Sequence, residues 1–539
     1  MNQEIGKVLG TLDAEPLGYW IAVPADEVLQ LDEVVMVSRP LSDGRTVRSY
    51  GIVDTIVARH EGARLESDVF LSEQGVLPLT HAIKAHVSVT RIEPEIYVPP
   101  LPGQAVYRAE GTDRDQALFF DGMRKRFPLG VSRNGEPVYG NFEFLDGTRG
   151  AHVNISGISG VAAKTTYATF LLHGIFNVSV PGPERANTRA VIFNVKGEDL
   201  LFLDKANNAL PPEAAEIYRR LGLPAGPFES VSFFAPVRRG QEVLLPDTGM
   251  RSEGISAYCW SIEEFCRERY LRFLFADADA ETSQLSAIVD RIEAELVKLD
   301  VEGLNTFDDL VELIRDNVEA WAASAAPGTR SAFIRRLEAA AYRAGHLIRG
   351  GHSDRTARID WRRAQVTVVD IHNLHDRAKR FVIGVVLKKM FEEKESTGSA
   401  RPLVFVVLDE LNKYAPREGH SPIKDVILDI SERGRSLGII LIGAEQTASE
   451  VENRVVANSA FRVVGRLDLA EAQHAEYSFL PAVSRSRAGI LKPGSVIVSQ
   501  PEIPIPLLVQ FPFPAWATRP SEVAEAAGAD PFAGFGRSR

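Results

Sequence analysis

The sequence predicts an α/β protein with a parallel sheet as its core, a small β-barrel before that core and an all-helical insertion within it. Three observations support this fold class. Residues 1–96 contain short β-rich runs and no helical periodicity. From residue 112 onward, apolar runs such as AVIFNV, QVTVVDI and LVFVVLDEL alternate with helical stretches. Residues 255–350 carry apolar residues at helical spacing and almost no strand signal.

The first 96 residues are expected to form the barrel. Runs such as YWIAVP, EVVMVSR and GIVDTIVAR are separated by Gly, Asp, Pro and Ser. Short strands at regular spacing without intervening helices are typical of a small antiparallel barrel. Residues 97–111 begin with YVPPLPGQ, whose three prolines predict a linker.

The sheet is expected in two parts, residues 112–254 and 351–510, on either side of the helical insertion 255–350. Its apolar runs are four to seven residues long and uninterrupted, as a parallel sheet covered on both faces requires. The proline-rich tail begins near residue 501. We expect its first half to lie across a neighbour, and residues 511–539 to form a strap followed by a flexible end.

Composition limits the function classes. The net charge of -11 gives no general attraction to nucleic acid or to anionic membranes, so any DNA contact must come from a locally basic surface. Two cysteines exclude a disulfide framework and fit a reducing compartment. The first residues do not resemble a signal peptide, and no run of 18 apolar residues occurs. We therefore expect a cytoplasmic protein without a membrane segment.

The stretch NISGISGVAAKTT, residues 154–166, has the outline of a phosphate-binding loop between a strand and a helix. Backbone N–H groups of such a loop point at phosphate oxygens, and the helix dipole adds to the attraction. Lys164 is expected to reach the β and γ phosphates of ATP, and Thr165 to bind Mg²⁺. Ala163 replaces the usual second glycine, so the motif by itself is equally compatible with a strand-turn-helix that binds nothing. The candidate ATP-binding residues are Gly157, Gly160, Val161, Ala162, Ala163, Lys164, Thr165 and Thr166.

A second element lies in PLVFVVLDELNKYAP, residues 402–416, where an apolar run ends at Asp409 and Glu410. Asp409 is expected to hold Mg²⁺ through its water shell, and Glu410 to polarise the attacking water. The alternative is a strand that ends in an acidic helix cap.

A third element is SERGRSLGIILIGAEQ, residues 431–446, which places Arg433 and Arg435 before an apolar strand and Gln446 after it. Gln446 is expected to sense the γ phosphate, and Arg435 to stabilise transferred charge across a subunit boundary. Taken separately, each arginine is better explained as a solvated surface charge, and the position of the two between the acidic strand and Gln446 is what favours a functional role.

In the order of these elements, about residues 4 to 515 resemble the HerA-type hexameric ATPases of the FtsK/HerA superfamily. The resemblance implies a HAS-barrel-like N-terminal domain and a RecA-like P-loop NTPase core. It further implies an ATP- and Mg²⁺-dependent helicase or translocase acting on double-stranded DNA as a homo-hexamer, with a nuclease or other effector, in DNA end processing, repair or antiphage defence. Glu410, Arg435 and Gln446 are then the catalytic residues. Asn194 departs from the family, which has Asp there, and Arg149 is a second, offset arginine for action in trans.

Other polar residues have simpler interpretations. His372 and His375 are expected to be strand-end residues rather than zinc ligands. Arg238 and Arg239 are either part of a DNA-contacting pore loop or a solvated turn.

Two alternatives to the motor remain. One is a nucleotide-binding ring scaffold with slow or no hydrolysis that assembles or regulates an effector. The other is a secretion or conjugation ATPase of related fold, which the barrel and the missing membrane segment disfavour.

Overall fold

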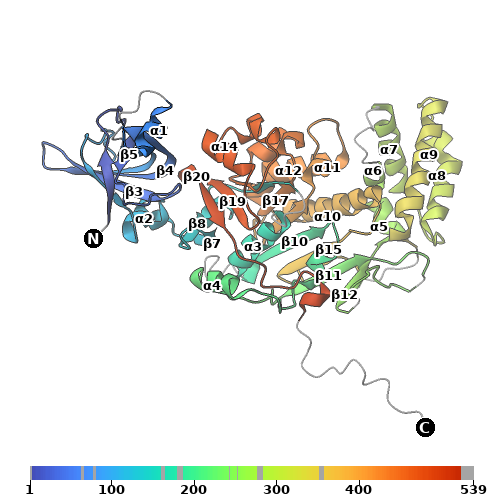
Figure 1. Ribbon diagram of the computed structural model, residues 1–539. Coiled ribbons are helices and arrows are strands. Elements are labelled where there is room, and N and C mark those ends of the chain that lie inside the picture. The colour runs from blue at the N-terminus through green and yellow to red at the C-terminus, as the bar shows by residue number, and fades with distance from the viewer. Residues whose placement is uncertain are drawn as a thin grey trace, which may run out of the picture.

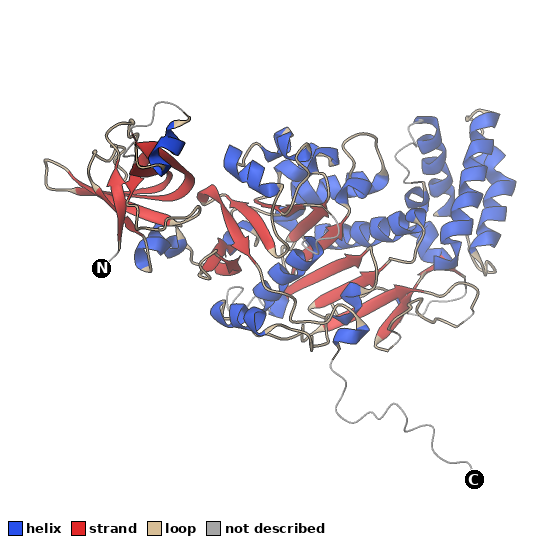
Figure 2. Ribbon diagram, in the orientation of Figure 1, coloured by secondary structure: helices blue, strands red, loops and turns tan. Residues whose placement is uncertain are grey.

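The computed structural model describes residues 3–61, 66–76, 80–158, 164–178, 186–241, 243–251, 253–275, 283–350 and 357–523. A β-barrel lies at one end, a large sheet covered by helices in the middle, and a group of helices at the other end (Figures 1 and 2). The predicted fold class, an α/β core with an N-terminal barrel and a helical insertion, is confirmed.

The barrel is closed, with the strand order β1-β2-β5-β4-β3-β6. Successive side chains of a strand point to opposite faces. Accordingly Tyr19, Ile21, Val35 and Val37 are buried inside the barrel, and most of the residues between them are partly exposed. The strands are β1 (Glu4–Val8), β2 (Gly18–Val23), β3 (Val34–Pro40), β4 (Thr46–Glu61), β5 (Thr80–Glu93) and β6 (Ala105–Arg108).

The predicted linker, residues 97–111, needs correction because it contains β6. This strand pairs with both β1 and β3 and thereby closes the barrel. A strand of four residues close to prolines carries too little periodicity to be recognised from sequence. The barrel therefore ends at Arg108.

The central sheet has twelve strands in the order β12-β11-β15-β10-β16-β17-β9-β18-β19-β20-β7-β8. The strands from β12 to β18 are parallel, and the rest of the sheet is antiparallel. The parallel strands are β9 (Val153–Ser156), β10 (Thr188–Asn194), β11 (Val231–Pro236), β12 (Ile255–Tyr258), β15 (Val366–Asp370), β16 (Leu403–Asp409), β17 (Ile439–Glu445) and β18 (Phe461–Val464). The antiparallel strands are β7 (Arg126–Val131), β8 (Pro137–Asn141), β19 (Ser495–Gln500) and β20 (Ile503–Gln510).

Helices cover both faces of the parallel part. In β10, Val191 and Phe193 pack into the core on one face, while Ala190 and Ile192 pack into the core on the other. Helices α10 (Asp376–Thr397) and α12 (Pro422–Leu437) contribute to the first core, and α3 (Lys164–Asn177) with α4 (Pro212–Arg220) contributes to the second. Burial on both faces explains why these strands are continuous apolar runs.

The helical insertion lies between β12 and β15 and packs against α10 through α6 and α9. Its first residues, 255–258, form strand β12 of the central sheet, so the insertion begins later than predicted. Its helices are α5 (Ile262–Arg267), α6 (Leu271–Leu274), α7 (Ser283–Leu296), α8 (Phe307–Trp321) and α9 (Pro327–Ala344), bracketed by the short pair β13 (Trp260–Ser261) and β14 (Ile348–Arg349). Short helices elsewhere are α1 (Asp68–Glu73), α2 (Thr112–Ala117), α11 (Leu411–Tyr414), α13 (Asn453–Ala457) and α14 (Ala482–Ala488).

The first half of the tail, which was expected to lie across a neighbour, contains a strand of this chain's own sheet. Residues Ile503–Gln510 form β20, which pairs with β19 of the same chain. Val509 is fully buried in the sheet. This part of the tail belongs to the core.

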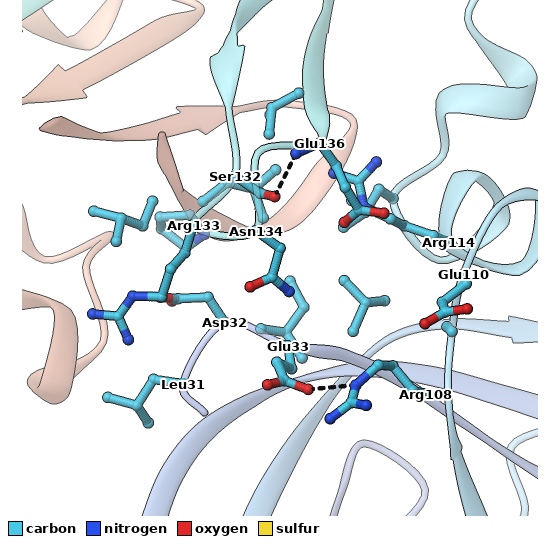
Figure 3. A pocket seen from close by; sticks show the side chains of 18 residues that line it. Leu31, Asp32, Glu33, Arg108, Glu110, Arg114, Ser132, Arg133, Asn134 and Glu136 are labelled. Carbon is cyan, nitrogen blue, oxygen red and sulfur yellow. Dashed lines mark hydrogen bonds and ion pairs between the residues drawn. The ribbon is translucent and has the colours of Figure 1, made fainter. Parts of the chain in front are cut away.

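Barrel and core meet at a cavity of about 260 Å³ with charged walls (Figure 3). On the barrel side, Arg108 Nε donates to Glu33 at 2.8 Å. Beside the cavity, both outer nitrogens of Arg487, in α14 of the core, donate to the carboxylate of Asp32, at 2.8 and 2.7 Å. A two-point guanidinium-carboxylate contact has a defined geometry, so this pair fixes the barrel against the core.

Among the helices of the described ranges, none combines the length and the apolar character needed to span a bilayer.

Candidate functional site

The site lies at the edge of the sheet where β16, β17 and β9 end. The three strands are neighbours, and their registers align Asp409 with Ala444 and Glu445 with Ser156. Because parallel strands finish at the same edge, the residues that follow them meet there. The sheet thus brings together elements that are far apart in the sequence.

Lys164 and Thr165 form the first turn of α3, directly after β9 and its loop. Lys164 is buried, and its Nζ donates to the carbonyl of Gly157 at 2.7 Å. Burial lowers the pKa of Lys164, although Asp409 opposes this shift. Thr165 Oγ1 donates to Asp409 Oδ2 at 3.3 Å, so the two predicted Mg²⁺ residues are in contact. The predicted residues Gly160, Val161, Ala162 and Ala163 lie outside the described residues.

Glu410 follows β16 in a left-handed backbone conformation, with φ of 57°. This conformation is unusual for a residue other than glycine and is often found at functional sites. Its backbone N–H donates to Asp409 Oδ1 at 2.8 Å. The carboxylate forms ion pairs with Lys196 and with Lys413, each at 2.8 Å. Burial raises the pKa of Glu410, but the hydrogen bonds from the two lysines outweigh it and hold the pKa below its usual range.

Sequence reasoning missed Lys196, which stands two residues after β10 in the segment NVKGED. Asn194 explains its position. Asn194 Nδ2 donates to Asp370 Oδ1 at 2.8 Å and to the carbonyl of Gly197 at 2.7 Å. These bonds fix the turn that presents Lys196 to Glu410. The side chain of Asn194 therefore has a structural role in this chain.

His372 and His375 also lie after a strand, as predicted. His372 Nδ1 contacts the carboxylate of Asp370 at 2.9 Å, and the side chain of His375 caps the N-terminus of α10. Within the described ranges, no group of three or more His, Cys, Asp or Glu residues is arranged to hold a metal ion.

Gln446 directly follows β17 and is exposed. Its neighbour Glu445 is fully buried beside β9, where its Oε1 accepts a hydrogen bond from Ser156 Oγ at 3.0 Å. Burial raises the pKa of Glu445 to about 8, so the side chain is mostly protonated at neutral pH. Sequence reasoning assigned no role to Glu445, because nothing in GAEQ distinguishes a buried acid from an exposed one.

The raised pKa of Glu445 predicts a pH-dependent stability. An unfolded glutamate loses its proton near pH 4.3, but the folded protein keeps it up to about pH 8. The unfolded state then binds fewer protons in this window, so stability falls as pH rises. Glu445→Gln is expected to remove this loss. The free energy of unfolding of the variant, relative to that of wild type, should therefore rise by about 2–4 kcal/mol from pH 5 to pH 8. Denaturant unfolding at both pH values measures it, with exposed Glu319→Gln as the control. A difference that does not change with pH would contradict the assignment.

Arg435 and Arg149 lie together at the opposite edge of the sheet. Arg435 Nη2 donates to the carbonyl of Thr148 at 2.8 Å, and Arg435 Nε donates to that of Gly147 at 3.1 Å. Gly147, Thr148 and Arg149 precede β9, whereas the candidate phosphate-binding loop follows it in the sequence. Neither arginine therefore lies at its own chain's site. Arg433, the other basic residue of this motif, pairs with Glu395.

The candidate pore-loop arginines are held within the chain. Arg239 Nη2 donates to the carbonyl of Tyr342 in α9 at 2.6 Å, and its guanidinium lies over the ring of that tyrosine. Arg238 Nε lies 3.8 Å from Asp247 Oδ1.

A cavity of about 560 Å³ opens beside α3. Lys164, Thr165, Thr166 and Asp409 line one part of it, and Lys196 also faces it. Glu410 and Gln446 are not among its lining residues. Another part is lined by residues 511–514, 516, 518, 519 and 522 of the C-terminal segment. Sequence reasoning did not place this segment at the site, because a proline-punctuated run gives no sign of its path.

The oxygens near Thr165 fit a magnesium ion. A hydroxyl and a carboxylate are in contact there, and hard oxygen donors with room for water are what Mg²⁺ prefers. Thr165 and Asp409 would hold the ion, which would neutralise charge on phosphate oxygens.

Comparison with known proteins gives similar structures but no family. No protein-family model matches the sequence, and no curated protein matches it. Among solved structures, VirB4 of Thermoanaerobacter pseudethanolicus is 17% identical over 73% of this chain and 97% of its own, with a TM-score of 0.44. The bacterial conjugative coupling protein TrwB is 13% identical over 73% of this chain and 91% of its own, with a TM-score of 0.45. At such TM-scores the likeness assigns no function.

Proposed function

We propose that this chain is a HerA-type ATPase that hydrolyses ATP with Mg²⁺ and uses the energy to translocate double-stranded DNA. The observation that carries the proposal is the meeting of Lys164, Thr165, Asp409 and Glu410 at one edge of a parallel sheet, with three of them lining one cavity. A basic group, a hydroxyl and two carboxylates in this order along the chain are the parts that phosphoryl transfer from ATP requires.

Each residue has a separate role in the proposed reaction. Lys164 binds the β and γ phosphates, and Thr165 and Asp409 hold Mg²⁺. Glu410 orients and polarises the attacking water, and Gln446 senses the γ phosphate. General-base assistance of this kind contributes about 10²–10⁴-fold to a rate.

The position of Arg435 and Arg149 supports a ring. Arginines at the opposite edge of the sheet can contact a bound nucleotide only if the nucleotide site of another subunit lies against that edge. We therefore propose a homo-hexamer around DNA, in which Arg435 acts in trans. A nuclease or other effector is the proposed partner, in DNA end processing, repair or antiphage defence.

A second candidate is a nucleotide-binding scaffold with slow or no hydrolysis. The two ion pairs on Glu410 favour it, because a carboxylate neutralised by Lys196 and Lys413 is a weak base. In the motor, nucleotide or DNA binding must free Glu410 from these lysines before each turnover.

Phosphate release measured with and without duplex DNA separates the two candidates. The motor is expected to hydrolyse ATP, with turnover rising at least tenfold when duplex DNA is added. A protein that binds ATP but whose turnover stays at the background rate with DNA would support the scaffold instead. Sedimentation with ATP tests the ring, and a monomer under all conditions would contradict it.

A further inference from the structure

The cavity at the candidate site has a second end that phosphate chemistry does not explain. We propose that residues 511–523, called the strap from here on, form a nucleobase subsite in which Phe513 stacks on the base of the bound nucleotide. This inference rests on the proposed function, since it concerns the same cavity. It assigns a role to the segment FPFPAW, which the proposed motor chemistry leaves unused.

The strap is fixed to the core on both sides of Phe513. Before it, the N–H of Phe511 donates to the carbonyl of Gly494 at 2.9 Å. After it, Ala515 accepts from the N–H of Asn207 at 3.0 Å and donates to the hydroxyl of Tyr218 at 3.2 Å. In Figure 1 the strap runs from β20 past α3 and ends in a short red helix. A segment held in this way presents its side chains from a constant position.

Phe513 differs from the other two aromatic residues of the strap. The ring centroid of Phe511 lies 5.1 Å from that of Tyr167, and the ring centroid of Trp516 lies 5.2 Å from that of His173. Both residues are buried, but Phe513 is 44% exposed. Pro512 and Pro514 flank it, and their rings restrict the backbone there. The side chain of Phe513 is thus held at a cavity wall with much of its surface uncovered.

The composition of the cavity matches the two halves of a nucleotide. One part carries the ammonium of Lys164 and the oxygens of Thr165 and Asp409, which suit phosphates and Mg²⁺. The strap supplies the exposed ring of Phe513 between two prolines, which suits a flat base. Polar side chains of the strap also line the cavity, namely Thr518, Arg519 and Glu522. The volume of about 560 Å³ is within the range of about 300–1,000 Å³ usual for small-molecule sites. A single nucleoside triphosphate can therefore occupy both parts.

Stacking on an aromatic ring depends little on which base is present, because every base has a π-face. We therefore expect Phe513 to contribute to the binding of both ATP and GTP. Inorganic tripolyphosphate has phosphates but no base, so its binding is expected to be independent of Phe513. This difference isolates the base contact from the phosphate contacts.

The experiment measures, by calorimetry with Mg²⁺, the binding of ATP and of tripolyphosphate to the full chain. Phe513→Ala is expected to raise the Kd for ATP about tenfold and to leave that for tripolyphosphate unchanged. Phe513→Trp is expected to restore ATP binding, since it restores an aromatic surface. The matched control is Phe70→Ala, which removes an exposed phenylalanine of the barrel that is 62% exposed. It is expected to change neither Kd.

An unchanged Kd for ATP in Phe513→Ala would overturn the inference and leave the proposed function standing. Equal weakening of ATP and tripolyphosphate would also overturn it, because the effect would then reach the phosphates rather than the base. If wild type bound neither ligand, the proposed function itself would fail, and the inference with it. Because the test measures binding alone, it does not depend on whether the protein hydrolyses ATP.

Discussion

Replacing Glu410 by Gln is expected to abolish ATP hydrolysis while leaving ATP binding intact. Glutamine has nearly the same shape as glutamate. The hydrogen bond from the backbone N–H of residue 410 to Asp409 Oδ1 does not involve the side chain that is replaced. The substitution removes the charge that we propose polarises the attacking water, so turnover should fall by about 10²–10⁴-fold. Steady-state phosphate release measures the loss, and calorimetric titration with ATP and Mg²⁺ measures the binding.

The matched control for this prediction is Glu418→Gln, an exposed glutamate beyond α11 that should leave turnover unchanged. Lys196→Met provides a further readout. Without this lysine the pKa of Glu410 in the free protein rises, so the loss of kcat/KM on acidification should begin at a higher pH than in wild type. Wild-type turnover in Glu410→Gln would show that another group activates the water. Equal, slow turnover in both proteins would support the scaffold.

The sequence predicted the parallel core well because local chemistry determines it. Strands such as Leu403–Asp409 are apolar at every position since both faces are covered, and this pattern is visible without knowledge of the fold. The same reasoning placed Asp409 and Glu410 at the end of an apolar strand and Lys164 after another strand, and parallel strands end at the same edge of a sheet. The contact between Thr165 and Asp409 agrees with that placement.

What the sequence did not reveal depends on contacts between distant segments. The ion pair of Lys196 with Glu410 follows from the turn that Asn194 fixes, and no spacing in the sequence connects these residues. The burial of Glu445 depends on the pairing of β17 with β9. Strand β6 and the strap lie in or beside proline-rich segments, and the sequence of such a segment does not indicate where it packs. In each case the missing information is tertiary.

The second large effect is expected from Lys164→Ala, which should remove most of the affinity for ATP. Hydrogen bonds from a charged donor contribute about 1.5–3 kcal/mol each, so the Kd should rise about 10- to 100-fold. Lys164 is buried, and its ammonium donates to the carbonyl of Gly157. Calorimetry of the same kind measures the change, with the exposed Lys298→Ala as the control.

Lys164→Ala and Phe513→Ala should differ in which ligand they affect. The loss of Lys164 should weaken ATP and tripolyphosphate to a similar extent, because the side chain faces the phosphate part of the cavity. The loss of Phe513 should weaken only the ligand that has a base. If Lys164→Ala bound ATP as tightly as wild type, the stretch GISGVAAKT would be a strand-turn-helix without a nucleotide. The opposite result, with both ligands weakened, means that Ala163 does not prevent the loop from binding phosphates.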